Sequence, residues 1–161
     1  MKIVLGFDDS PHALEALHWI RRQAWPAGTR IIVVSAVRAP VTAYAEVYAP
    51  AIPYPSEMVE ELTRHHEELT MRAESELRES GFSTGARVLQ GDPREVLVDV
   101  AKAEGADLVV VGSHGKSAVP EFFVGSVARG VATHCPVSVL VVRARPAKHR
   151  GLEPRKRKSR A

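Results

Sequence analysis

The sequence predicts one α/β domain, in which parallel strands alternate with helices that cover both faces of the sheet. Short runs rich in Val and Ile, without polar alternation, are typical of strands buried on both faces. Between these runs lie segments whose apolar residues recur at helical spacing. A chain of 161 residues is long enough for one such domain with a full core.

The first strand is expected over residues 3–7 and is followed by a helix. Ser10 is a suitable N-cap, and Pro11 suits the first helical position. The apolar residues at helical spacing are Ala13, Leu17, Ile20 and Ala24. We expect this face to pack on the sheet, and Pro26 and Gly28 to end the helix.

A second buried strand is expected over residues 31–37, and a long segment rich in Pro and Tyr follows over residues 38–56. Loops of this length without structure of their own are often lids or binding loops. Two interpretations stay open, a binding loop and a disordered insert. In the first, Tyr44, Tyr48 and Tyr54 cover a ligand or pack on the helices.

A long charged helix is expected over residues 57–80, closed by Gly81. One side of it carries Met58, Leu62, His65, Leu69, Ala73 and Leu77. We expect this side to face the sheet. Residues 84–90 then predict a third strand.

The next helix starts with a capping box. Asp92 is its N-cap, Pro93 occupies the first position, and Glu95 occupies the third. Gly105 is expected to end this helix, as glycine commonly does.

The rest of the domain contains two more strands and one helix. The fourth strand is expected over residues 107–111, a helix begins near Gly125, and the fifth strand covers residues 137–142. The alternation therefore predicts one doubly wound, open sheet of five parallel strands, with helices on both faces.

Charge divides the chain into an acidic body and a basic tail. Residues 143–161 carry nine Lys or Arg and one Glu, a net +8, whereas residues 1–142 carry a net −5. We expect a domain over residues 1–143 and a disordered tail over residues 144–161. Two interpretations of the basic tail stay open: it binds a nucleic acid or an acidic partner, or it is a solvated terminus without a partner. We favour the second.

The chain is expected to be intracellular and cytoplasmic. No apolar run approaches the twenty or so residues of a membrane span, so no membrane partner is expected. The start of the chain does not resemble a signal peptide. Cys135 is the single cysteine, so no disulfide can form within the chain.

A glycine-rich stretch, Gly112-Ser113-His114-Gly115, lies between the fourth strand and the helix that begins near Gly125. Open α/β sheets bind ligands at the carboxyl ends of their strands. There, glycines allow close approach, and a helix start favours an anion. Asp8, which ends the first strand, would border the same crevice and accept hydrogen bonds from ribose or base.

The rest of the expected anion site comes from Ser126, whose hydroxyl would hold phosphate oxygens, and from His114 and Lys116 on the loop. The residues alone therefore predict an anion or nucleotide site without naming the nucleotide.

Four other site classes do not fit the sequence. Neither a Walker sequence nor a G-x-G-x-x-G after the first strand is present. A receiver domain would need an aspartate at the end of the third strand and a lysine after the fifth. Gln90 and Arg143 stand there instead. No Ser-His-Asp arrangement can be argued around His114.

The glycine pattern carries a family resemblance. Gly112, Gly115, Gly125 and Ser126 follow the order Gly-x-x-Gly, nine residues, Gly-Ser. This resembles the ATP-binding signature of the universal stress protein family. Three further stretches agree with the family pattern: residues 4–10, 91–93 and 135–142. The resemblance covers residues 1–143.

The resemblance implies a fold and an assembly. The strand order would be 3-2-1-4-5, as in proteins that resemble the adenine nucleotide alpha hydrolases. A homodimer would pair through the fifth strands. Two positions depart from the family pattern: many members have glycine at Asp9, and many are basic around Glu121.

The resemblance also implies ATP, with or without Mg²⁺, as the ligand. Asp8 would lie near base and ribose, and Ala36 and Val37 would border the adenine. Glycines and the residues beside them would line ribose and phosphates. The full set of implied ATP-binding residues is Gly6, Phe7, Asp8, Ala36, Val37, Gly112, His114, Gly115, Gly125, Ser126 and Val127.

The expected function is that of a nucleotide-dependent regulator in the stress response. The family analogy allows slow ATP hydrolysis or phosphorylation at Ser126, but the sequence does not indicate a fast enzyme. The alternative is a dimeric interaction module of the same fold that binds no nucleotide and uses the glycines only for tight turns.

Overall fold

The computed structural model describes residues 1–38, 56–115 and 124–144. The Pro- and Tyr-rich segment, the loop with Lys116 and Glu121, and the basic tail lie outside these residues, so their predictions stay open. The described elements, in chain order, are β1 (Lys2–Gly6), α1 (Pro11–Arg22), β2 (Arg30–Val37), α3 (Ser56–Glu79), β3 (Ser83–Gln90), α4 (Pro93–Glu104), β4 (Leu108–Gly112), α5 (Ser126–His134) and β5 (Ser138–Val142).

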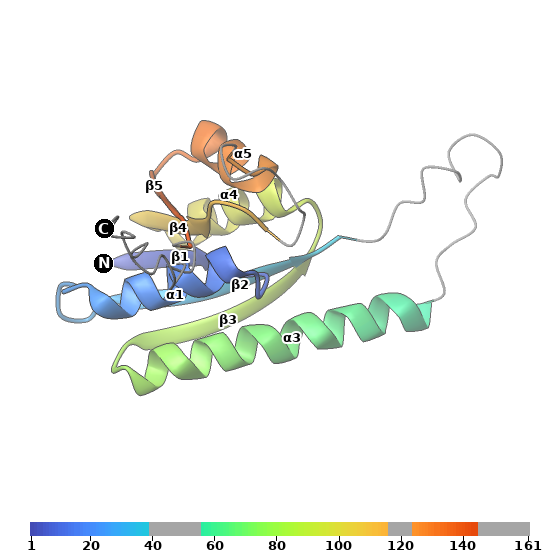
Figure 1. The fold of residues 1–161 in the computed structure, drawn as a ribbon, viewed down its shortest axis with the longest axis horizontal. Coiled ribbons are helices and arrows are strands. Elements are labelled where there is room, and N and C mark those ends of the chain that lie inside the picture. The colour runs from blue at the N-terminus through green and yellow to red at the C-terminus, as the bar shows by residue number, and fades with distance from the viewer. Residues whose placement is uncertain (39–55, 116–123, 145–161) are drawn as a thin grey trace, which may run out of the picture.

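The strands form one sheet in the order β3-β2-β1-β4-β5, and every neighbouring pair is parallel. Helices α1 and α3 cover one face, and α4 and α5 cover the other (Figure 1). The predicted doubly wound fold and its strand order are therefore confirmed. Because β2 and β4 flank β1, the carboxyl ends of these three strands lie together at one edge.

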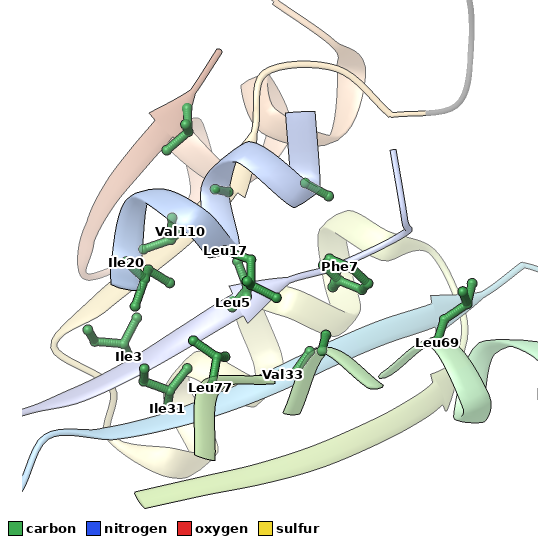
Figure 2. Close-up of a cluster of buried hydrophobic side chains, with 14 residues drawn as sticks. Ile3, Leu5, Phe7, Leu17, Ile20, Ile31, Val33, Leu69, Leu77 and Val110 are labelled. Atoms are coloured by element: carbon green, nitrogen blue, oxygen red, sulfur yellow. The ribbon is translucent and has the colours of Figure 1, made fainter. Parts of the chain in front are cut away.

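The core consists of two layers, because successive strand residues point to opposite faces of the sheet. Ile3 and Leu5 of β1 pack with α1 and α3 (Figure 2), whereas Val4 packs with α4 and α5. In β2, Ile31 and Val33 follow the first pattern, and Ile32 and Val34 follow the second. Both faces of β1 and β2 are buried, as their apolar sequences predict.

Helix α1 begins as expected and ends earlier. The Ser10 hydroxyl accepts a hydrogen bond from the Ala13 N–H at 3.2 Å, which caps the helix. Gln23 is already extended, and Ala24 is exposed rather than buried. Trp25 precedes a proline, and such a residue disfavours the helical region. The helix therefore stops before the apolar spacing does.

The buried stripe of α3 differs from the predicted one. Leu69, Ala73 and Leu77 face the core, but His65 and Met58 are exposed. At about 100° per residue, His66 falls on the helix face between the buried residues Ala73 and Leu77, whereas His65 lies well to one side of that face. The first turns of α3 also extend beyond the strands (Figure 1), so Met58 has no sheet to cover.

Helix α4 begins and ends at the predicted caps. The Asp92 carboxylate accepts a hydrogen bond from the Arg94 N–H at 2.8 Å, and Gly105 ends the helix in the left-handed conformation. Within the described ranges, no helix is long and apolar enough to cross a membrane.

Candidate functional site

A crevice lies at the carboxyl edge of β1, β2 and β4, where the starts of α4 and α5 and the side of α3 converge. Its volume is about 350 Å³. It is lined by Asp8, Ala36, Arg38, Leu62, His66, Pro93, Gly112, Ser113, His114, Gly115, Gly125, Ser126, Val127 and Ala128. This is the place where doubly wound sheets bind ligands.

Most of the predicted site residues border this crevice. Eight do so directly: Asp8, Ala36, Gly112, His114, Gly115, Gly125, Ser126 and Val127. Gly6 borders a smaller cavity of about 100 Å³ that shares several of these walls. Phe7 and Val37 are buried and border neither cavity, and the Phe7 ring belongs to the core under α1 and α3 (Figure 2). The structure therefore does not place their side chains against a ligand.

The glycines allow parts of the protein itself to approach closely. A Cβ on Gly112 would lie 2.7 Å from the backbone of His12 and Ala13, at the start of α1. A Cβ on Gly125 would lie 3.0 Å from the Ser113 carbonyl, which already accepts the Gly125 N–H at 2.7 Å. These two glycines therefore have an internal steric role, whatever the crevice binds.

The start of α5 differs from the starts of α1 and α4. Side chains cap α1 and α4, whereas Gly125 stands at the N-cap of α5 and supplies no side-chain hydrogen bond. The first turn of a helix has N–H groups without intrahelical partners. At α5 the residues of this turn, Ser126 to Ala128, line the crevice, so the turn is suited to an anion.

Asp8 lies across the crevice from α5. Its Oδ1 accepts the Ser10 N–H at 3.1 Å, which fixes the carboxylate at the end of β1. Its Oδ2 lies beside Gly115, where an added Cβ would approach to 2.7 Å. The predicted juxtaposition of Asp8 with the glycine loop is thus present.

His114 is held inside the loop by two hydrogen bonds. Its carbonyl accepts the Ser10 hydroxyl at 3.2 Å, and its Nδ1 lies 3.0 Å from the Ser113 hydroxyl. The residue is only 7% exposed, and its Nε2 is buried without a hydrogen-bond partner. A buried polar atom without a partner on a cavity wall is the kind of group that a ligand completes.

His12 and His114 share the hydroxyl of Ser113. Ser113 Oγ lies 3.0 Å from His12 Nδ1 and 3.0 Å from His114 Nδ1, and the Ala144 N–H donates to His12 Nδ1 at 2.9 Å.

One wall of the crevice was missed by sequence reasoning. Arg38, Leu62, His66 and Pro93 border it but were not predicted as site residues. The spacing His66–Ala73–Leu77 would have placed His66 on the inner side of α3. Arg38 directly follows β2, so the topological argument that places Asp8 after β1 would also have found it.

Arg38 belongs to an ion-pair group at the rim. Its guanidinium lies 2.6 Å from Asp92 Oδ2, and Arg94 donates to both carboxylate oxygens at 2.9 and 2.7 Å. The Arg94 hydrogen bond, with smaller contributions from the positive charges, holds the pKa of Asp92 well below its ordinary value despite partial desolvation. Asp92 also raises the pKa of Arg94. Arg38 is thereby held at the mouth of the crevice.

The described residues contain no group of three or more His, Cys, Asp or Glu side chains that could hold a metal ion.

The strand order and the glycine-rich crevice define a protein of the doubly wound α/β class. The chain belongs to the universal stress protein family, whose sequence profile matches residues 1–143. It is similar to the universal stress protein in the QAH/OAS sulfhydrylase 3' region of Thermus aquaticus. The two are 35% identical over 147 residues, which cover 88% of this chain and 97% of that protein.

Solved structures are also similar. Hypothetical protein MJ0577, a universal stress protein of Methanocaldococcus jannaschii, superimposes with a TM-score of 0.77 at 26% identity, covering 91% of this chain and 97% of that one. A universal stress protein family member from Arabidopsis thaliana, solved with AMP bound, has a TM-score of 0.66 at 17% identity. The match covers 90% of this chain and 92% of that chain, and at this sequence identity it shows a shared fold alone.

Proposed function

We propose that this protein binds an adenine nucleotide, with ATP as the ligand, in the crevice at the carboxyl edge of the sheet. The observation that carries the proposal is the combination of Asp8 with the uncapped start of α5 across one cavity. A carboxylate suits ribose hydroxyls or a base amino group, and an uncapped helix start suits phosphate oxygens. A nucleotide supplies both kinds of group at once.

The charges suggest how the nucleotide lies. Phosphates would lie at Gly125, Ser126 and Val127, away from the Asp8 carboxylate. The base would lie toward Ala36 at the end of β2, and the ribose would lie between them, near Asp8 and Gly115. Mg²⁺ would enter with the phosphates, since the described residues offer no metal cluster of their own.

We infer a nucleotide-dependent regulator of the stress response in the cytoplasm, with at most slow ATP hydrolysis. Ser126 is the hydroxyl nearest to the proposed phosphates and is the candidate for phosphorylation. A homodimer paired through β5 belongs to the same proposal, because β5 is an edge strand with half-buried apolar residues.

A second function, an interaction module of the same fold that binds no nucleotide, is favoured by one observation. Gly112 and Gly125 are each required by close backbone packing, so both would be retained without any ligand. The experiment on nucleotide binding therefore has to avoid these positions.

Calorimetric titration with ATP and Mg²⁺, and with AMP, tests the proposal. We expect saturable binding, weakened about tenfold in Asp8→Ala and about fivefold in Ser126→Ala, because each variant loses polar contacts to the nucleotide. Ser83→Ala, at an exposed site on β3, is the matched control and should bind like the wild type. Absence of saturable binding at millimolar nucleotide would contradict the proposal and favour the interaction module.

A further inference from the structure

The wall of the crevice that α3 contributes lies far along the chain from the glycine loop. Leu62 and His66, one helical turn apart, both border the crevice opposite the elements that carry the loop. Helix α3 packs on β2 and β3 and passes the carboxyl end of β2 on its way (Figure 1). His66 therefore shares a cavity with Ala36, at the carboxyl end of β2.

A buried hydroxyl anchors the imidazole of His66. Ser35, only 1% exposed, lies one residue before Ala36, and its Oγ is 2.8 Å from His66 Nδ1. This bond fixes the ring relative to β2, so little rotamer freedom remains to be lost when a ligand binds. The ring is thus a preformed part of the crevice wall.

The surroundings of His66 suit a planar aromatic group rather than a phosphate. Ala36, Leu62 and Pro93 present apolar surface at this end, whereas the uncapped helix start lies at α5. Aromatic side chains hold nucleobases by stacking, in offset or edge-to-face geometry. Arg38, held at the rim by Asp92, adds a second planar group at the same end.

We propose that His66 contacts the base of the bound nucleotide and, with Ser35 as its positioning residue, sets the preference of the crevice for an aromatic base. The inference rests on the proposed nucleotide site and assigns its base-contacting wall to α3. The competing explanation is that the Ser35–His66 bond only fastens α3 to β2.

The first experiment compares His66→Ala with His65→Ala. His65 is the adjacent, exposed histidine on the same helix and does not border the crevice, so it is the matched control. We expect His66→Ala to weaken AMP binding by about five- to tenfold, and to leave the binding of ribose 5-phosphate unchanged. His65→Ala should bind both ligands like the wild type.

The second experiment detects the base directly. The imidazole proton resonances of His66, assigned by their absence in His66→Ala, should move when AMP is added, because an aromatic base beside the ring changes the local field. Ribose 5-phosphate should leave them in place. The His65 ring lies edge-on to His66, with 6.1 Å between the ring centroids, so its resonances should move much less than those of His66 when AMP is added. A role that only fastens α3 would not produce this response.

The outcomes separate the two proposals. If the wild type binds AMP but His66→Ala binds it equally well, or the His66 resonances do not respond to AMP, the base contact is wrong and the nucleotide site stands. An equal loss of AMP and ribose 5-phosphate binding in His66→Ala would also overturn the base contact. If the wild type binds neither AMP nor ATP, the nucleotide site itself is wrong.

Discussion

Asp9 has the only left-handed backbone among the described non-glycine residues, with a φ of 59°. This explains the departure from the family resemblance noted above, since glycine adopts this conformation at no steric cost. Aspartate tolerates it better than most residues, because its short side chain can bond locally. The turn between β1 and α1 is therefore mildly strained.

The strain predicts the effect of substitutions at Asp9. Asp9→Gly should raise the free energy of unfolding by about 0.5 kcal/mol, and Asp9→Val should lower it by about 1–2 kcal/mol, because a β-branched residue is poorly accommodated there. Urea denaturation at neutral pH measures both. Equal stability of the two variants would show that the turn can relax into another conformation.

Two glycines of the same motif should respond differently to a single methyl group. A Cβ on Gly112 would meet the backbone of His12 and Ala13, which cannot move without shifting α1, so Gly112→Ala should cost about 2 kcal/mol of stability. A Cβ on Gly115 would meet only the end of the Asp8 side chain.

Gly115→Ala should therefore leave stability within about 0.5 kcal/mol of the wild type, but weaken nucleotide binding by displacing the Asp8 carboxylate. Denaturation and calorimetry on the same two variants check both expectations. Loss of stability in Gly115→Ala comparable to that in Gly112→Ala would contradict this division of roles.

At the scale of elements, the start of α4 depends on Asp92. Removing the cap in Asp92→Ala should cost about 1 kcal/mol, and Asp92→Asn should cost less, because an amide oxygen still caps the helix. Thermal or urea unfolding of the three proteins measures these differences.

The charge of Asp92 makes part of its contribution depend on pH. Hydrogen bonding from Arg94 lowers its pKa in the folded protein below the value near 4 of an unfolded chain. Because the pKa of Asp92 is lower in the folded protein than in the unfolded chain, its ionised carboxylate stabilises the folded state at pH values above the unfolded pKa. This stabilisation is lost as the pH falls toward the folded pKa. The advantage of the wild type over Asp92→Asn should thus be constant near neutral pH and shrink below about pH 4. An advantage that stays constant into acid would contradict the assignment.

The elements were predicted well where the signal is local. Caps at Ser10 and Asp92 and the closing Gly105 fixed three helix ends, because these residues act on neighbouring backbone groups. The end of α1 was misplaced, since apolar spacing continued to Ala24 after the backbone had already turned.

The residues of the crevice could be predicted where the topology of the sheet alone places them. Asp8 and the glycines lie directly after two strands, so the parallel topology alone brings them together. Arg38 directly follows β2 and could have been predicted in the same way. His66 reaches the crevice only through the packing of α3, which the sequence does not specify locally. Phe7 and Val37 were assigned to the ligand by resemblance, Val37 through its backbone groups. Strand alternation turns their side chains into the core, and a backbone contact with a ligand stays a prediction.

At the scale of the whole molecule, nucleotide binding should appear as global stability. A ligand that binds only the folded state, present at a hundred times its dissociation constant, adds about 2.7 kcal/mol to the free energy of unfolding. For a chain of this size the melting temperature should rise by roughly 5–10 °C. Differential scanning calorimetry with and without AMP measures the shift, and Asp8→Ala should show a smaller one at the same concentration.

The two edges of the sheet predict how the molecule assembles. Both β3 and β5 are edge strands, but β3 is mostly polar, whereas β5 carries the half-buried residues Val139, Leu140 and Val141 in succession. An apolar edge with unpaired backbone groups is a site for pairing with another chain. A homodimer through β5 would cover this edge, while β3 can stay in water.

Leu140→Lys should therefore convert a dimer into a monomer, because the lysine places a charge within the paired surface. The matched control is Leu89→Lys on β3, where the leucine is already 39% exposed and the edge is not expected to pair. Sedimentation velocity at micromolar concentrations gives the mass of each variant, and circular dichroism verifies that each remains folded. A folded Leu140→Lys that stays dimeric, or a Leu89→Lys that alone becomes monomeric, would place the interface away from β5. A monomeric wild type, with or without ATP, would remove the dimer from the proposed function altogether.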